Sequence, residues 1–134
     1  MIEKKFRGSK SRKIKILIAD DDPYNIEITS IFLKYFNAEI YEATNGQEAV
    51  EIVKKNHDID IILMDINMPE MDGLEACKKI KHAHQGIQII ASTAYASKYE
   101  ISEVMKGGFD DFLLKPFSRE RLITIVKKLI VLNG

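Results

Sequence analysis

The stretch IDIILMDINMPEMDG, residues 59–73, contains an apolar run, an aspartate, a turn and a helix start, in that order. The apolar run at 59–64 is continuous rather than alternating, which is typical of a strand buried on both faces of a sheet. Asp72, followed three residues later by Glu75, resembles a capping box, so a helix is expected to begin near residue 73. The stretch therefore predicts a buried strand, a loop that begins at Asp65, and a helix.

The same unit recurs along the whole chain. Apolar runs that indicate strands lie at residues 14–19, 38–43, 59–64, 87–91 and 112–114. Helices are expected to begin near residues 23, 46, 73 and 98 and after Ser118, with helix-start signals at Asp22–Pro23, Asn45–Glu48 and Ser97–Glu100. Five strand–helix units predict an α/β fold in which helices cover both faces of a parallel sheet. Since no G-x-G-x-x-G follows the first strand, a doubly wound five-stranded sheet in the order 2-1-3-4-5 is favoured.

The composition limits the size of the protein and its partners. The 134 residues include 20 basic and 20 acidic side chains, so there is no overall positive field that would favour nucleic acid or a membrane surface. Lysine and arginine are frequent in the first fifteen residues, which predicts a flexible basic tail at 1–12 ahead of a single domain at 13–134. No apolar stretch approaches a membrane span, and the single cysteine, Cys77, is expected in the core. A cytoplasmic protein is therefore expected.

Polar residues follow four of the predicted strands. Asp20 and Asp21 end the first strand and Asp65 ends the third, while Ser92 and Thr93 end the fourth and Lys115 ends the fifth. The carboxyl ends of parallel strands share one edge of a sheet, so these side chains are expected to meet there. Three carboxylates at one edge would repel one another unless a cation lies among them, and ligands that are all oxygen favour Mg²⁺. A lysine and a hydroxyl beside the metal would complete a clamp for a phosphoryl group.

Four segments at these strand ends carry a resemblance to a known family. IADDDP at 18–23, ILMDINMPEMDG at 62–73, STA at 92–94 and FLLKPF at 112–117 are similar to the four signature blocks of response-regulator receiver domains. They stand in the same order and at similar spacing, and the resemblance covers about residues 13–132. It implies a flavodoxin-like (βα)5 fold, and residues 13–134 would be the receiver domain.

The resemblance also implies roles for the residues that hold the metal. Asp65 would be the phosphoacceptor and would bind Mg²⁺ together with Asp21. Asp20 would bind the metal through water, and the backbone carbonyl of Asn67 would be the remaining protein ligand.

Other residues would transmit the signal. By the same resemblance, Thr93 would bond to the new phosphoryl group, Lys115 would pair with it, and Phe112 would be the aromatic side chain that rotates inward. The Lys115–Pro116 peptide bond would be cis. Tyr95, two residues after the switch hydroxyl, would lie over the phosphoryl group and slow its hydrolysis.

The predicted function is that of a phosphoacceptor switch in a two-component system or phosphorelay, rather than an enzyme acting on other molecules. A histidine kinase or a histidine phosphotransfer protein would be the donor, and the face formed by the fourth helix, fifth strand and fifth helix would change on phosphorylation. A magnesium phosphatase would need a second acid two residues after Asp65, where the chain has Asn67. A degenerate receiver that only binds partners would be expected to lack Asp65, Lys115 or one of the acidic pair.

Two further features of the sequence carry weaker expectations. The first helix has more apolar residues than one buried stripe needs, so part of the set Tyr24, Ile26, Ile31 and Tyr35 is expected at the surface. The three histidines, His57, His82 and His84, are expected to be solvated.

Overall fold

The computed structural model describes residues 13–94 and 98–133. The strands are β1 (Lys15–Ala19), β2 (Glu39–Ala43), β3 (Ile61–Asp65), β4 (Gln88–Thr93) and β5 (Asp111–Leu114). The helices are α2 (Pro23–Phe32), α3 (Gly46–Lys55), α4 (Gly73–Ala83), α5 (Lys98–Lys106) and α6 (Arg119–Asn133), with a short 3-10 helix η1 (Leu33–Phe36) after α2. Strands and helices alternate in the predicted order.

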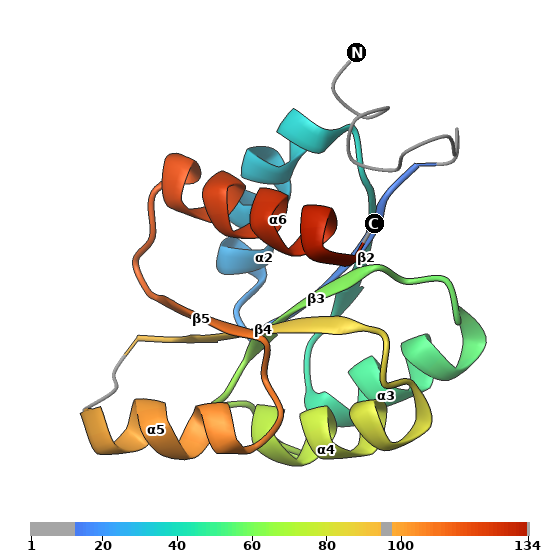
Figure 1. Cartoon of the computed structure of the whole chain (residues 1–134), viewed down its shortest axis with the longest axis vertical. Helices are drawn as coiled ribbons and strands as arrows, with labels where there is room; N and C mark the ends of the chain where they lie inside the picture. The colour runs from blue at the N-terminus through green and yellow to red at the C-terminus, as the bar shows by residue number, and fades with distance from the viewer. Residues whose placement is uncertain (1–12, 95–97, 134) are drawn as a thin grey trace.

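The five strands form one parallel sheet in the order β2-β1-β3-β4-β5. Helices α2 and α6 cover one face of this sheet, and α3, α4 and α5 cover the other (Figure 1). The predicted flavodoxin-like architecture and strand order are confirmed. Strand order reverses between β1 and β3, so the carboxyl ends of these two strands border the crevice where ligands of such sheets bind.

Alternate residues of the strands contribute to two separate cores. Leu17 of β1 and Ile62 of β3 belong to the core beneath α3, α4 and α5. Ile16 and Ile18 of β1, with Leu63 of β3, belong to the core beneath α2 and α6. Because successive strand side chains point to opposite faces, a run without polar residues fills both layers. The central strands are therefore buried on both sides and hold the residues at their ends in fixed positions.

Side-chain caps fix the starts of three helices as the sequence predicted. The backbone amide of Tyr24 donates to Oδ1 of Asp22 (3.0 Å) at the start of α2. Asn45 accepts from the amide of Glu48 (2.8 Å) at α3, and Asp72 accepts from that of Glu75 (2.9 Å) at α4. The expected cap at Ser97 lies outside the described residues. Each cap satisfies a backbone amide that has no partner inside its own helix.

The first helix departs from expectation in its length and in the face it buries. It ends at Phe32, and the next turn is 3-10 in character and closes at Asn37, whose φ of 52° lies in the left-handed region that asparagine tolerates. Ile26 is buried, so its placement in the surplus apolar set is wrong. Tyr24 and Ile31 are exposed, as expected for part of that set. The buried stripe includes Thr29, which a purely apolar pattern misses.

Other sequence expectations have mixed outcomes. Cys77 is fully buried, and burial raises the pKa of its thiol to about 11, so it is a core residue as expected. Across residues 13–94 and 98–133, no helix has the length and apolar character needed to cross a membrane. The expected basic tail at 1–12 lies outside the described residues, and its flexibility stays a prediction.

Candidate functional site

Four adjacent strands deliver the candidate residues to one edge of the sheet. Asp20 directly follows β1, Asp65 is the last residue of β3, and Thr93 is the last residue of β4. Lys115 directly follows β5. Since β1, β3, β4 and β5 are neighbours in that order, side chains distant in the sequence meet at the carboxyl edge. The predicted convergence of these residues is present in the structure.

Three carboxylates lie together at this edge. Each of Asp20, Asp21 and Asp65 offers an oxygen atom, and these atoms all lie within 4.8 Å of one another. Asp20 and Asp65 are buried, whereas Asp21 is exposed. The backbone amide of Asp22 donates to Oδ1 of Asp20 (2.9 Å), which fixes the orientation of that carboxylate. A set of oxygen donors with one side open to solvent fits Mg²⁺, which favours carboxylates and retains several waters.

Lys115 connects two of the three carboxylates. Its Nζ donates to Oδ2 of Asp20 at 2.7 Å and to Oδ2 of Asp65 at 3.2 Å. The side chain is mostly buried, and the Lys115–Pro116 peptide bond is cis, as the resemblance implied. Here the ammonium group partly offsets the charge of the buried carboxylates. It also lies within reach of any group bound to Asp65.

The pKa values of Asp65 and Lys115 are both shifted, and each residue contributes to the shift of the other. Burial raises the pKa of Asp65, the nearby Asp20 raises it further, and Lys115 and the amide of Asn67 oppose the rise. Burial lowers the pKa of Lys115, but its hydrogen bond to Asp20 and the charge of Asp65 outweigh this, so the net change is upward. The lysine is therefore fully charged near neutral pH, whereas the Asp65 carboxylate lies in an environment that favours additional positive charge.

Asn67 contacts both the predicted phosphoacceptor and the predicted switch hydroxyl. Its backbone amide donates to Oδ1 of Asp65 (3.1 Å), and its side-chain Nδ2 donates to Oγ1 of Thr93 (3.4 Å). Thr93 is buried. The asparagine side chain thus lies between the ends of β3 and β4, a position that strand periodicity alone did not predict.

The loop after Asp65 is held tightly against helix α4. The amide of Gly73 donates to the carbonyl of Ile66 (2.9 Å), and a Cβ atom at residue 73 would lie 2.3 Å from the carbonyl oxygen of Asp65. Only glycine allows the helix to start this close to the strand end. The sequence signal for this contact was the glycine that follows the Asp72 cap.

A recess beside the carboxylates was not predicted from the sequence. It has a volume of about 440 Å³, and its walls are mainly apolar. Among the lining residues, Ile28 and Phe32 come from α2 and Phe117 comes from the loop after β5. Ser92 also lines it, and the buried Oγ atom of this residue has no hydrogen-bond partner within the described part of the chain. The recess explains why some apolar residues of α2 are only half-buried.

The two aromatic residues near β5 differ in burial. Phe112 is half-buried and borders a shallow groove between β5 and α6. Phe109 is buried in the core. Tyr95, expected to lie over the phosphoryl group, is outside the described residues, so its placement stays a prediction.

The sequence that forms these strand ends, with their three carboxylates and one lysine, matches a known protein family. Residues 16–127 match the family model of the response regulator receiver domain, and the chain therefore belongs to this family. Receiver domains are the signalling modules of two-component response regulators. The boundaries predicted from the sequence, 13–134, extend slightly beyond the matched residues on both sides.

One curated relative is a bacterial transcriptional regulator. Transcriptional regulatory protein SrrA of Staphylococcus aureus is 36% identical over 116 residues, which are 87% of this chain and 47% of SrrA. The chain thus spans about half the length of the curated relatives it matches.

Two solved complexes contain similar receivers. A CheX–CheY–BeF3–Mg²⁺ complex from Borrelia burgdorferi matches with a TM-score of 0.83 and 25% identity, over 87% of this chain and 88% of the other. A complex of the Saccharomyces cerevisiae histidine phosphotransfer protein Ypd1 with the receiver domain of Ssk1 matches with a TM-score of 0.82 and 29% identity, over 90% of both chains.

Proposed function

We propose that this receiver is a phosphoacceptor switch that takes a phosphoryl group from phosphohistidine onto Asp65. The observation that carries the proposal is the position of the Asp65 carboxylate, which lies among two further carboxylates and 3.2 Å from the Lys115 ammonium. Asp65 is buried, but it borders the recess at the carboxyl edge. A carboxylate in this setting can act as a nucleophile and can hold the product through neighbouring positive charge.

The acidic cluster fits a bound magnesium ion. Asp20, Asp21 and Asp65 would hold it through carboxylate oxygens, Asp20 by way of water, and the backbone carbonyl of Asn67 would be a further ligand. When bound, Mg²⁺ supplies the positive charge that neutralises phosphoryl oxygens during transfer. Within the described part of the chain, the three carboxylates outnumber the one lysine that contacts two of them, which supports a requirement for one more cation.

In the transfer step, an Asp65 oxygen attacks the phosphorus of the partner's phosphohistidine. The phosphorus–nitrogen bond breaks as the phosphorus–oxygen bond forms, and the electron pair of the broken bond stays on the imidazole. Lys115 keeps its charge and pairs with a phosphoryl oxygen. Water later attacks the acyl phosphate, which returns Asp65 to a carboxylate and releases inorganic phosphate.

The switch would begin at Thr93. Its hydroxyl now accepts a hydrogen bond from Asn67, and it would move to donate one to the phosphoryl group. That movement would open space into which Phe112, half-buried beside α6, could rotate. The face formed by α5, β5 and α6 would then present a different surface to an output partner.

The donor is proposed to be a histidine kinase or a histidine phosphotransfer protein. The Ypd1–Ssk1 complex supports this class of partner, because a receiver similar to this chain binds a histidine phosphotransfer protein there. The location of the protein in the cytoplasm also remains a proposal. Direct nucleic-acid binding is not expected, given the equal numbers of acidic and basic residues.

The second candidate is a degenerate receiver that only binds partners. The complete set of Asp20, Asp21, Asp65, Thr93 and Lys115 argues against it, since a receiver that had lost phosphotransfer would not need all five. The set gives no sign of a dedicated hydrolase either, because Asn67 stands where a phosphatase would need an acid.

Intact-mass measurement with acetyl phosphate and Mg²⁺ tests the proposal. The unsubstituted protein should gain one phosphoryl group, and Asp65→Asn should gain none. Asp22→Asn is the matched control: it removes a neighbouring carboxylate, and asparagine caps a helix as well as aspartate. Mg²⁺-stimulated labelling of the Asp65→Asn protein would contradict the assignment.

A further inference from the structure

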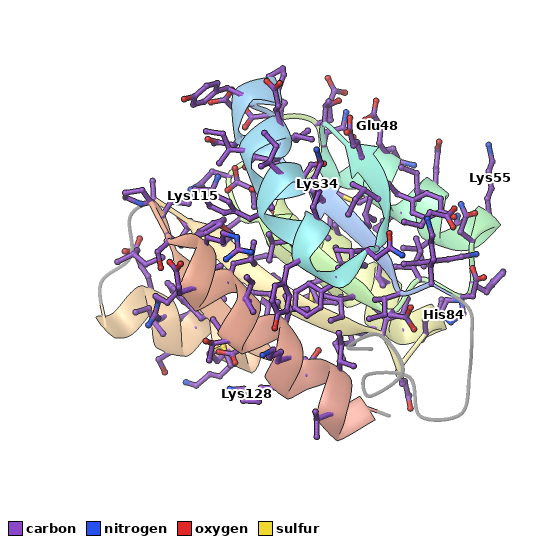
Figure 2. All side chains as sticks on the ribbon, turned by 90° about the horizontal axis from the view of Figure 1, so that it is seen from above. Lys34, Glu48, Lys55, His84, Lys115 and Lys128 are labelled. Carbon is purple, nitrogen blue, oxygen red and sulfur yellow. The ribbon has the colours of Figure 1, made fainter. Side chains whose placement is uncertain are left out.

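Two histidines meet at the end of the sheet opposite the phosphoacceptor. His57 follows Asn56, the residue that caps the carboxyl end of α3, and His84 caps the carboxyl end of α4. Their loops lead into β3 and β4, which are neighbours in the sheet. Figure 2 shows His84 and Lys115 at opposite ends of the molecule. The expectation that the histidines are merely solvated is incomplete, because two of them contact each other.

The contact joins one ring nitrogen of each histidine, and either ring nitrogen of an imidazole can be a metal ligand. Nδ1 of His57 faces Nε2 of His84, and the ring centroids lie 4.5 Å apart with the planes inclined by 53°. Two imidazole nitrogens that face each other can share a proton, or both can direct their lone pairs at one cation. His57 is exposed and His84 is half-buried, so a cation could reach them and keep water on its other positions.

Charges of both signs lie around the pair, because the last turns of α3 and α4 carry Lys54, Lys55 and Lys81. Both α3 and α4 end here, and the carboxyl end of a helix carries partial negative charge from its unpaired carbonyls. Two of these lysines are directed elsewhere. Nζ of Lys81 donates to the carbonyl of Ile87 and to Asp110, and the Lys55 side chain points away from His84 in Figure 2.

We propose that His57 and His84 form a binding site for a divalent transition ion of the zinc class. Imidazole nitrogen suits Zn²⁺, Cu²⁺ and Ni²⁺, whereas Mg²⁺ prefers oxygen, so this site and the acidic cluster select different ions. Zinc–nitrogen bonds are about 2.0–2.1 Å long, which places two tetrahedral nitrogen ligands roughly 3.3 Å apart. The rings need to separate slightly, and the exposed His57 side chain can move to allow this.

Such an ion would tie the loop before β3 to the loop before β4. The connection joins segments 27 residues apart in the chain, at the edge of the sheet where no phosphotransfer residue lies. Binding to the folded state alone raises its stability, and the gain grows with the logarithm of the ratio of the ion concentration to the dissociation constant. The site would therefore act on the stability of these loops and leave Asp65 accessible.

Isothermal titration with Zn²⁺ in the presence of excess Mg²⁺ tests the proposal on the full chain. One ion should bind per chain, with shifts in the amide NMR signals of residues 56–60 and 84–88. Loss of either ligand, by His57→Ala or His84→Ala, should weaken binding roughly tenfold or more. His82→Ala is the matched control, because His82 is exposed and lies outside the pair, and it should bind as tightly as the unsubstituted protein.

Three outcomes would overturn the proposal. The first is the absence of zinc binding under excess Mg²⁺. The second is binding that is as tight in His57→Ala and in His84→Ala as in the unsubstituted protein, and the third is binding that is lost only in His82→Ala. Circular dichroism verifies that each variant is folded. Asp65 labelling by acetyl phosphate should be unchanged in all three variants, which separates this site from the proposed phosphoacceptor.

Discussion

The two ends of the sheet use charge in different ways. At the amino end, two ion pairs are close: Lys15 pairs with Asp58 at 2.5 Å, and Lys81 pairs with Asp110 at 2.7 Å. Asp110 also accepts from the backbone amide of Ile89 (2.8 Å). At the carboxyl end, three carboxylates lie together, and Lys115 contacts two of them. These two pairs are balanced in charge, whereas the carboxylates at the other end outnumber the lysine that contacts them.

This difference separates residues that pair within the fold from residues that we propose to take part in phosphotransfer. Paired charges at the amino end fix the strand starts and need nothing from solution. The carboxylates at the other end repel one another, and a cation from solution removes that repulsion. The raised pKa of Asp65 reflects the same imbalance. Natural folds tolerate such unfavourable local arrangements where function depends on them.

The largest expected effect is on labelling. Asp21→Ala should lower Mg²⁺-dependent labelling by acetyl phosphate roughly 100-fold or more, because a metal ion contributes several kcal/mol and about 1.4 kcal/mol is a factor of ten. Asp58→Ala removes an exposed carboxylate at the amino end and should leave labelling unchanged. Equal losses in both variants, measured by intact mass over time, would erase the proposed distinction between the two ends.

The next effect is on stability and concerns the opposite end. Asp110→Ala leaves Lys81 and the amide of Ile89 without their carboxylate partner, and should lower the free energy of unfolding by about 1–3 kcal/mol. Urea unfolding followed by circular dichroism measures this change. Labelling of Asp65 in the folded fraction should persist. A variant as stable as the unsubstituted protein would show that this pair does not stabilise the sheet.

Magnesium binding should depend on pH. Because burial and Asp20 raise the pKa of Asp65, protons compete with the metal for its oxygens above the pH range of an ordinary aspartate. Affinity should rise between about pH 4 and pH 8 as the cluster loses its protons. NMR titration of the amide of Asn67 measures the affinity, and a flat profile across this range would mean that the carboxylates are not the ligands.

A smaller effect is expected on stability without metal. The folded-state pKa of Asp65 is raised above its ordinary value of 3.8, so the native state binds its proton more tightly than the unfolded chain does. Charging this group therefore destabilises the fold as the pH rises through the raised value. Asp65→Asn should stabilise the metal-free protein at neutral pH and give less benefit at acid pH. If thermal unfolding showed that Asp65→Asn destabilises the metal-free protein at neutral pH, the expected direction of the effect would be wrong.

Much of the fold follows from local features of the sequence. The continuous apolar run before Asp65 predicts a strand buried on both faces, and Asn45 and Asp72 mark helix starts that the structure confirms. The meeting of Asp20, Asp65 and Lys115 also follows, because the strand order brings the strand ends together. These features depend on spacing along the chain and on the general geometry of parallel sheets.

Contacts that depend on tertiary packing did not follow from the sequence. The burial of Ile26 depends on the rotation of α2 against the sheet, and the recess beside Asp65 depends on how α2 meets Phe117. The contact between His57 and His84 joins two loops of unrelated sequence. Neither apolar periodicity nor capping signals contain information on these distances.

The site of phosphorylation is the central claim and can be located directly. After incubation with acetyl phosphate and Mg²⁺, borohydride reduces an aspartyl phosphate to homoserine, and peptide mass mapping identifies the altered residue. The account predicts homoserine at position 65, which requires both the donor and Mg²⁺. An altered residue elsewhere, or no altered residue in protein that has gained a phosphoryl group, would contradict it.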